Sequence, residues 1–342
     1  KIIDLDIEPR HLLRLGHGEE ELESEERYSK AGRVESYLER RQFLLGQVQR
    51  LARDMGAVGD FGYTCETARM FFVTHVKVKW AAYQRKLNSG EPTRDCVAAG
   101  FPFGAFFEES ATTALFPDEA SGEELVEIAT SCYQYIADMF DELQDIQPFE
   151  LLRSSYDRSN YLLTNQARIV AMTCTHAALK RSDLLQLGFH YDTVVMEEAA
   201  QVLDIETFVP LAMQKTSRRL KRAVLIGDHN QLPPVVKSQG LKAFGNLEQS
   251  LFARMVRLGV PYVELNRQAR ARPEIADLYR FRYTSLGDLS SVSTGAFAAP
   301  NPGLANAFQF INTEDLDGQG ESEPTKHFYQ NVAEAEYAVA MY

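Results

Sequence analysis

The chain has 342 residues, of which 45% are hydrophobic, and it carries a formal net charge of −12 at pH 7. This length suits about two domains, and the apolar content is sufficient for a hydrophobic core. The sequence holds no run of the ~18 uncharged apolar residues that a membrane-spanning helix needs, and its acidity argues against a basic nucleic-acid-binding surface over the whole molecule.

The placement of charge and cysteine narrows the class of protein further. Residues 161–290 carry a net charge of +5 and the rest of the chain −17, so the overall charge does not exclude a local phosphate-binding groove. The four cysteines, Cys65, Cys96, Cys132 and Cys174, are far apart and form no CxxC pair. Their spacing favours a reducing compartment and argues against structural zinc.

The first 160 residues predict a helical region. Apolar residues recur at helical spacing over 22–55, 64–88 and 121–146, and each stretch is expected to form a helix whose apolar face packs on the others. The acid-rich run EEELESEE near the first helix is expected to be a solvated helix start. The aromatic turn FPFGAFF (101–107) is the one place in this region where aromatic surface can remain for a partner.

After residue 160, short apolar runs alternate with helical patterns. The runs predict four buried strands, at 167–174, 192–198, 223–228 and 261–265, with helices over 177–187 and 247–258. Alternating strands and helices predict a parallel sheet with crossover connections. Ligands of such sheets bind beyond the carboxyl ends of the strands, so the polar residues that follow the strands are the candidate site.

Thr173, Thr175 and His176 stand at the end of the first of these strands. Hydroxyl groups and unpaired N–H groups at a helix start suit a phosphate oxygen. The alternative is a plain N-cap, with Thr175 capping the helix that follows. Cys174 and His176 have no further candidate metal ligand near them in the sequence, which argues against a metal site.

Glu197 and Glu198 stand at the end of the second strand. Burying two adjacent carboxylates is costly unless a cation or a water network compensates their charge. In nucleoside triphosphatases this place holds one carboxylate that serves Mg²⁺ and one that orients the attacking water. The alternative is an exposed pair at a helix start, where acidic residues interact favourably with the helix dipole.

The third strand leads into GDHNQLPP. Gly227 allows a tight turn, Asp228 can cap that turn, and Gln231 offers a donor and an acceptor to a water or a phosphate oxygen. Pro233 and Pro234 stiffen the segment that follows. An ordinary strand-to-turn connection is the alternative, and the paired carboxylates upstream make it the weaker interpretation.

Three arginines follow the fourth strand. Arg267, Arg270 and Arg272 lie within six positions of one another. The fork of the arginine side chain suits phosphate, whereas the alternative is a basic, solvated loop.

Together these segments resemble the superfamily 1 helicases, in the branch that contains the nonsense-mediated-decay helicase. One box of that branch reads Asp-Glu-Ala-x-Gln, and EEAAQ (197–201) matches it with Glu in place of the first Asp. GDHNQLPP matches the coupling motif in full, QARA (268–271) stands where Gln-Tyr-Arg-Met is usual, and MTCTHAA corresponds to the motif that touches the nucleic-acid backbone. Flanking phrases such as MEEAAQVLDIETFVPL are similar to spliceosomal, intron-binding RNA helicases, and they extend the resemblance to nearly the whole chain.

The resemblance implies an α/β fold with a RecA-like parallel sheet and a large α-helical insertion. The sheet would be incomplete, because the phosphate-loop strand and helix are expected to lie outside this chain. Residues 1–20 would be a remnant of the first RecA-like domain, 21–160 the insertion, 161–305 the main part of that domain, and 306–342 the start of a second one. The chain is thus expected to be a piece of a longer polypeptide. It contains no GxxxxGK motif followed by Ser or Thr, and by itself it is expected not to hydrolyse ATP.

The roles implied by the family make ATP and Mg²⁺ the cofactors. Glu197 would hold Mg²⁺ through water, Glu198 would be the base for the attacking water, and Gln231 and Arg270 would contact the γ-phosphate region. Gln268 would also contact the nucleotide. The contacts to RNA would come from Thr173, Thr175, His176, Pro233 and Pro234.

The implied partners are intron RNA and spliceosomal scaffold proteins, in the nucleus and with no membrane involved. Two residues depart from the family pattern. Glu197 adds a methylene to the metal-binding position, and Ala269 replaces a tyrosine that stacks on adenine, which is expected to weaken base recognition by ~1–3 kcal/mol. Two alternatives stay open: a helicase-like spliceosomal scaffold without ATPase activity, and a DNA helicase.

Overall fold

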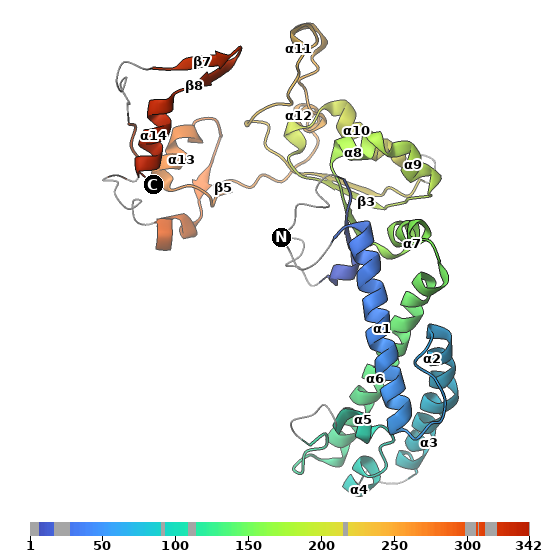
Figure 1. The fold of residues 1–342 in the computed structure, drawn as a ribbon. Helices are drawn as coiled ribbons and strands as arrows, with labels where there is room; N and C mark the ends of the chain where they lie inside the picture. The colour runs from blue at the N-terminus through green and yellow to red at the C-terminus, as the bar shows by residue number, and fades with distance from the viewer. Residues whose placement is uncertain are drawn as a thin grey trace. The chain divides into compact units, whose positions relative to one another are not determined.

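The computed structural model describes residues 7–16, 28–89, 93–108, 114–214, 218–297, 306, 308–311 and 320–341. The chain folds into two compact units, one made of Lys1–Val195 with Ile205–Val224 and the other of Met196–Asp204 with Leu225–Tyr342. The fold is mixed α/β (Figure 1). In the described part of the chain the strands form four two-stranded sheets. No described helix combines the length and the apolar character needed to cross a membrane.

In the first unit, one strand precedes the helical segment and another follows it, and the two strands pair in parallel. β1 (Leu12–Arg14) pairs with β2 (Ile169–Ala171), with Leu12 opposite Ile169 and Leu13 opposite Val170. Leu12 and Leu13 are buried. Parallel neighbours need a long connection rather than a tight turn, and here the connection consists of helices.

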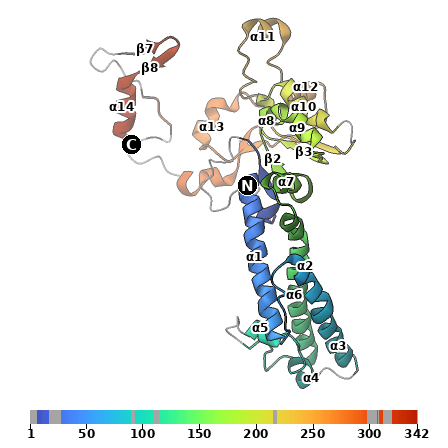
Figure 2. The same ribbon diagram turned by 45° about the vertical axis from the view of Figure 1, so that its right-hand side comes forward.

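The helices between these strands pack into a bundle. Figures 1 and 2 both show α1 and α6 running side by side, and α2 also packs against α6. The elements are α1 (Lys30–Asp54), α2 (Cys65–Phe71), the π-helical turn η3 (Phe72–Val76), α3 (Lys77–Leu87), α4 (Arg94–Ala98), α5 (Gly104–Glu108), α6 (Gly122–Leu151), α7 (Ser155–Tyr161) and the π-helical turn η4 (Leu162–Gln166).

Apolar spacing and capping residues explain why these helices form where they do. Val48 and Leu51 of α1 and Ile136 of α6 are buried in one hydrophobic core, as periodic apolar positions require. At the helix starts, Thr64 and Ser121 each form a capping box, in which side chain and backbone satisfy each other's free N–H groups.

The helix boundaries correct the sequence predictions at several points. The helix predicted over 22–55 begins at Lys30, and the acid-rich run at 19–26 lies outside the described residues. The helix predicted over 64–88 contains the π-helical turn η3, and the one predicted over 121–146 continues to Leu151.

The aromatic turn at 101–107 is packed inside the bundle. Phe101, Phe103 and Phe106 are all buried, and the rings of Phe101 and Phe103 meet edge to face with centroids 5.6 Å apart. The guanidinium of Arg50 lies 4.3 Å from the centre of the Phe106 ring. The prediction that these three rings leave aromatic surface for a partner is therefore wrong, because the bundle itself covers them.

β3 (Thr193–Met196) and β4 (Arg222–Leu225) form a second pair. The carbonyl of Asp192 accepts a hydrogen bond from Lys221 N at 2.8 Å, and that of Met196 accepts from Ile226 N at 2.8 Å, so the two strands advance in the same direction. The neighbouring helices are α8 (Cys174–Leu179), α9 (Arg181–Gln186), the 3-10 turn η5 (Ala199–Gln201) and α10 (Asp204–Met213).

These strands are shorter and more exposed than the sequence predicts. Val195 is 60% exposed and Val224 is 44% exposed. A two-stranded sheet has no inner strand, so side chains that would be buried in a wider sheet remain accessible. The prediction of fully buried strands is wrong for β3 and β4.

The rest of the second unit consists of short elements. They are α11 (Gln239–Gly245), α12 (Leu251–Arg257), β5 (Arg267–Gln268), α13 (Pro273–Arg280), β6 (Gly287–Asp288), the 3-10 turns η6 (Ser290–Ser293) and η7 (Gly295–Phe297), β7 (Ser322–Thr325), β8 (Phe328–Gln330) and α14 (Val332–Met341). β5 and β6 pair in parallel, and β7 and β8 form an antiparallel pair.

The strand predicted at 261–265 is absent. That segment has no regular structure, and Val263 and Leu265 are 90% and 87% exposed. A strand exists only where a neighbour completes its hydrogen-bond ladder, and no described segment pairs with this one. Only Arg267 and Gln268, just after it, form a short strand.

Candidate functional site

Two of the predicted loops lie against each other in the second unit. The N–H of Ala199 donates to the carbonyl of Ile226 at 2.9 Å, directly after the paired glutamates and directly before the Gly-Asp turn. A Cβ atom on Gly227 would lie 2.8 Å from the backbone nitrogen of Ala200, closer than such contacts allow. The glycine therefore permits the two loops to touch, and this contact is the foundation of the candidate site.

The paired glutamates occupy the start of the first of these loops. Both side chains are exposed, and Glu197 makes no hydrogen bond or ion pair with any described residue. Glu198 has a left-handed backbone (φ 51°), which is uncommon for a residue other than glycine, and its Oε2 accepts from Gln201 Nε2 at 3.0 Å. Such backbone outliers cluster at functional sites, so the conformation supports a functional role for Glu198.

Asp228 is the centre of the second loop. Its Oδ1 accepts from the N–H of Asn230 at 2.9 Å, and its Oδ2 accepts from Gln231 Nε2 at 2.9 Å and from the phenol of Tyr283 at 2.6 Å. Partial burial alone would raise the pKa of Asp228. The hydrogen bonds from Tyr283, Gln231 and Asn230 outweigh burial and hold that pKa below its ordinary value. The carboxylate is therefore an ionised acceptor at neutral pH.

Gln268 shapes the loop that carries Arg270. Its Oε1 accepts from the N–H groups of Arg270 and Ala271, both at 2.9 Å, and its Nε2 donates to the Ala271 carbonyl and to Asp288. The hydrogen bond from Gln268, together with an ion pair to Arg280, lowers the pKa of Asp288. The Arg270 side chain is exposed, so the loop presents it to solvent while the glutamine fixes the backbone behind it.

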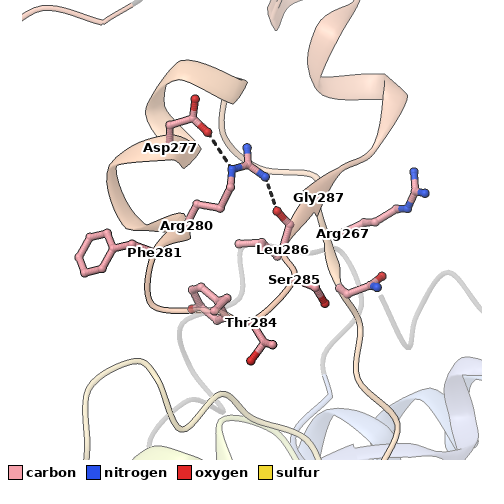
Figure 3. Close-up of a pocket in the computed structure, with 10 residues that line it drawn as sticks. Arg267, Asp277, Arg280, Phe281, Thr284, Ser285, Leu286 and Gly287 are labelled. Carbon is pink, nitrogen blue, oxygen red and sulfur yellow. Dashed lines mark hydrogen bonds and ion pairs between the residues drawn. The ribbon is translucent and has the colours of Figure 1, made fainter.

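An open hollow of about 710 Å³ lies beside this loop, lined by residues of α13 and of the turn that follows it (Figure 3). Arg280 donates to Asp277 at 2.7 Å and to the carbonyl of Leu286, and Figure 3 shows these contacts bracing one wall. Tyr283 also lines the hollow. The sequence interpretation missed Tyr283, Arg280 and Asp288, because they belong to no motif and act through contacts that only the folded chain creates.

The predicted RNA-contact residues of the first unit stand at the start of α8. The side chain of Thr173 accepts from the N–H of His176 at 3.1 Å and so caps the helix. The alternative interpretation named Thr175 as the cap, and the structure shows that the cap is Thr173. Thr175 is exposed, and His176 lies against Gly16, where an added Cβ would be 3.1 Å from its Nδ1.

The structure brings some of the predicted site residues together and leaves others apart. The segments of Glu198 and Gln231 are neighbours through the loop contact. In the described part of the chain no hydrogen bond or ion pair joins Arg270 to either of them. Of the two prolines after Gln231, Pro234 is buried and Pro233 exposed. No cluster of three or more described His, Cys, Asp or Glu residues is placed to hold a metal ion.

Comparisons with known proteins agree with the helicase resemblance. A family model described as AAA domain matches residues 9–239. Along its whole length the chain is 51% identical to the mouse protein named RNA helicase aquarius, of which it covers 24%. Along 97% of its length it is 28% identical to the pre-mRNA-splicing factor cwf11 of Schizosaccharomyces pombe, of which it covers 25%.

A shorter match reaches the wider helicase group. Over 39% of its length the chain is 32% identical to the regulator of nonsense transcripts 1 homolog of Arabidopsis thaliana, of which it covers 10%. The chain thus spans about a quarter of the length of the first two relatives and a smaller share of the third.

Proposed function

Because this chain belongs to the AAA domain family, we propose that it forms part of the motor of an ATP-dependent RNA helicase that acts in pre-mRNA splicing in the nucleus. The observation that carries the proposal is the contact between the Glu198 loop and the Gly227 loop, with Ala199 N donating to Ile226 O at 2.9 Å. A motor of this kind needs a carboxylate and a glutamine side by side at the ends of two parallel strands.

The proposed architecture follows the family. Residues before about 20 and from 161 to 305 would form one RecA-like domain around the helical insertion, and residues from 306 would enter a second. The parallel pairing of β1 with β2 across the helical segment supports this division, since an insertion must leave and re-enter the same sheet.

The chemistry proposed for the site is the hydrolysis of ATP. Glu198 would accept the proton of the attacking water, Gln231 would orient that water, and Arg270 would compensate the charge of the γ-phosphate. The carboxylate of Glu197 is exposed and pairs with no residue in the described part of the chain. It fits Mg²⁺, which proteins hold with one or two carboxylates and substrate phosphates. Bound there, the ion would neutralise phosphate charge. Gln268 would act on the nucleotide by fixing the Arg270 loop.

RNA would contact Thr173, Thr175 and His176 in the first unit and Pro233 and Pro234 in the second. Intron RNA and spliceosomal scaffold proteins are the proposed partners, supported by the names of the two relatives that match along the chain. Comparing RNA with DNA of the same sequence in the binding and ATPase assays tests the choice of nucleic acid. Equal stimulation by both would contradict an RNA-specific motor.

The decisive experiment is RNA-stimulated ATP hydrolysis by the full-length protein that carries this chain. Glu198→Gln is expected to lower the turnover rate by roughly 10²–10⁴-fold, as loss of a general base does, with nucleotide binding retained. Glu264→Gln is the matched control, because Glu264 is an exposed glutamate in the same unit with no described side-chain contact. Equal rates for Glu198→Gln and the wild type would refute the assigned role.

Two departures from the family pattern support a second candidate, a spliceosomal scaffold without ATPase activity. Ala269 stands where the family has a tyrosine that stacks on adenine, and Glu197 where it has aspartate. Under this alternative the full-length protein would bind RNA and its protein partners but would neither bind nor hydrolyse ATP. Nucleotide-binding titrations with ATP, GTP and CTP separate the two, since the motor is expected to bind all three with little selectivity.

A further inference from the structure

Tyr283 is joined to the Gly-Asp loop although no motif includes it. We infer that Tyr283 is a positioning residue: through Asp228 it fixes the side-chain amide of Gln231 so that the Gln231 carbonyl oxygen is the group offered to the attacking water. The inference rests on the proposed function and deepens it, because it names which end of the Gln231 amide acts.

Asp228, Gln231 and Tyr283 form a cluster, called the triangle below, in which two donors meet one carboxylate oxygen. Oδ2 of Asp228 accepts from Gln231 Nε2 at 2.9 Å and from Tyr283 Oη at 2.6 Å. The other oxygen of Asp228 is held by the N–H of Asn230 at 2.9 Å, so the carboxylate cannot rotate without losing contacts.

Proton bookkeeping decides the orientation of the amide. An ionised carboxylate only accepts hydrogen bonds, so whatever faces Asp228 must donate. The NH₂ end of Gln231 must therefore point to Asp228. Tyr283 must likewise donate, and burial followed by the contact with Asp228 raises its pKa to about 12, which keeps the phenol protonated.

The consequence is that Gln231 keeps one unused acceptor. Its Oε1 makes no hydrogen bond in the described part of the chain, and one of the two N–H groups on its Nε2 donates to Asp228. An amide oxygen accepts a hydrogen bond from water and repels a phosphate oxygen. Through that oxygen Gln231 is thus prepared to orient a water molecule, and the exposed Arg270 supplies a charged donor to phosphate.

The test is a double-mutant cycle in the full-length protein with RNA-stimulated ATP hydrolysis. Tyr283→Phe is expected to lower kcat about tenfold, the scale of one lost hydrogen bond to a charged group, with KM for ATP unchanged. Tyr283→Phe in an Asp228→Ala background is expected to cause no further loss, because the tyrosine acts only through the carboxylate. Tyr279→Phe is the control, since its phenol has no described hydrogen bond.

A second measurement follows the triangle without catalysis. In this chain, the side-chain NH₂ of Gln231 is expected to exchange slowly with solvent by NMR, and Tyr283→Phe is expected to speed that exchange several-fold while Tyr279→Phe does not. A wild type that lacks ATPase activity would defeat the proposed function, and the exchange data would still decide the triangle. Unchanged exchange in Tyr283→Phe, or additive kcat losses in the cycle, would overturn the inference.

Discussion

The phenol oxygen of Tyr283 lies 2.6 Å from Oδ2 of Asp228, and the two residues are 55 positions apart in the chain. This contact ties the Gly-Asp loop to the turn that follows α13. The same helix begins directly after the arginine-bearing loop, at Pro273. The short helix α13 therefore connects the loop that carries Arg270 to the turn that holds Asp228 through Tyr283. A shift of α13 would displace both.

Gly227 is the residue whose substitution should most directly separate the two loops of the candidate site. Gly227→Ala places a Cβ 2.8 Å from the backbone nitrogen of Ala200, and backbone cannot move aside as a flexible side chain can. We expect the free energy of unfolding to fall by roughly 1–3 kcal/mol, the usual cost of overpacking, measured by urea titration. Gly240→Ala is the control: no atom lies within 4 Å of its Cβ position, and equal losses in both variants would contradict the explanation.

Thr173 and Thr175 should separate a structural role from a binding role. Thr173→Ala removes the side-chain oxygen that accepts from His176 N, and we expect a loss of about 0.5–2 kcal/mol of stability, as for other N-caps. Thr175→Ala is expected to leave the unfolding free energy unchanged and to weaken RNA binding, measured by fluorescence anisotropy at fixed salt. A stability loss in Thr175→Ala, with none in Thr173→Ala, would reverse the assignment of the cap.

Glu150 should give the helical bundle a pH-dependent stability. Its burial raises the pKa, but the N–H of Cys65 at 3.0 Å and the guanidinium of Arg41 at 2.6 Å outweigh burial and hold the pKa below the ordinary 4.5. A carboxyl group whose folded pKa is lowered stabilises the fold above its unfolded pKa. That stabilisation is lost as the pH falls through the folded value.

The measurement is thermal unfolding between pH 7 and pH 3. Glu150→Gln is expected to cost about 1.5–3 kcal/mol at pH 7, the range for a hydrogen bond to a charged group, and to flatten the decline of stability below pH 4.5. Glu127→Gln, on the exposed side of the same helix, is expected to unfold like the wild type at every pH. Parallel curves for Glu150→Gln and the wild type would remove Glu150 as the source.

The helical region was predictable because its signal is local. Periodic apolar positions and nearby capping residues fix α1 and α6, and both elements are confirmed with changes only at their ends. The strands were harder, because a strand is completed by a neighbour that sequence periodicity does not identify. The run at 261–265 is rich in apolar residues, as a buried strand would be, yet no described segment pairs with it.

In the candidate site, too, features with a local sequence signal were predictable and features that depend on a distant partner were not. The paired glutamates and the Gly-Asp turn were found from the sequence because each follows an apolar run, and their contact is a direct result of the parallel pairing of β3 with β4. The role of Thr173 as a cap required a choice between two neighbouring threonines that spacing alone did not resolve. Tyr283 could not be found, since its significance comes entirely from a partner 55 residues away.

The parallel pairing of β1 with β2 sets a rule for redesigning this protein. Strands that run in the same direction cannot be closed by a two-residue hairpin, so deleting the helices between Arg14 and Ile169 would leave a gap that only a crossover of about a dozen residues or more can bridge. Added turns at the far end of the bundle meet no such restriction. Insertions can therefore lengthen the bundle, whereas a deletion must keep a crossover long enough to join β1 to β2.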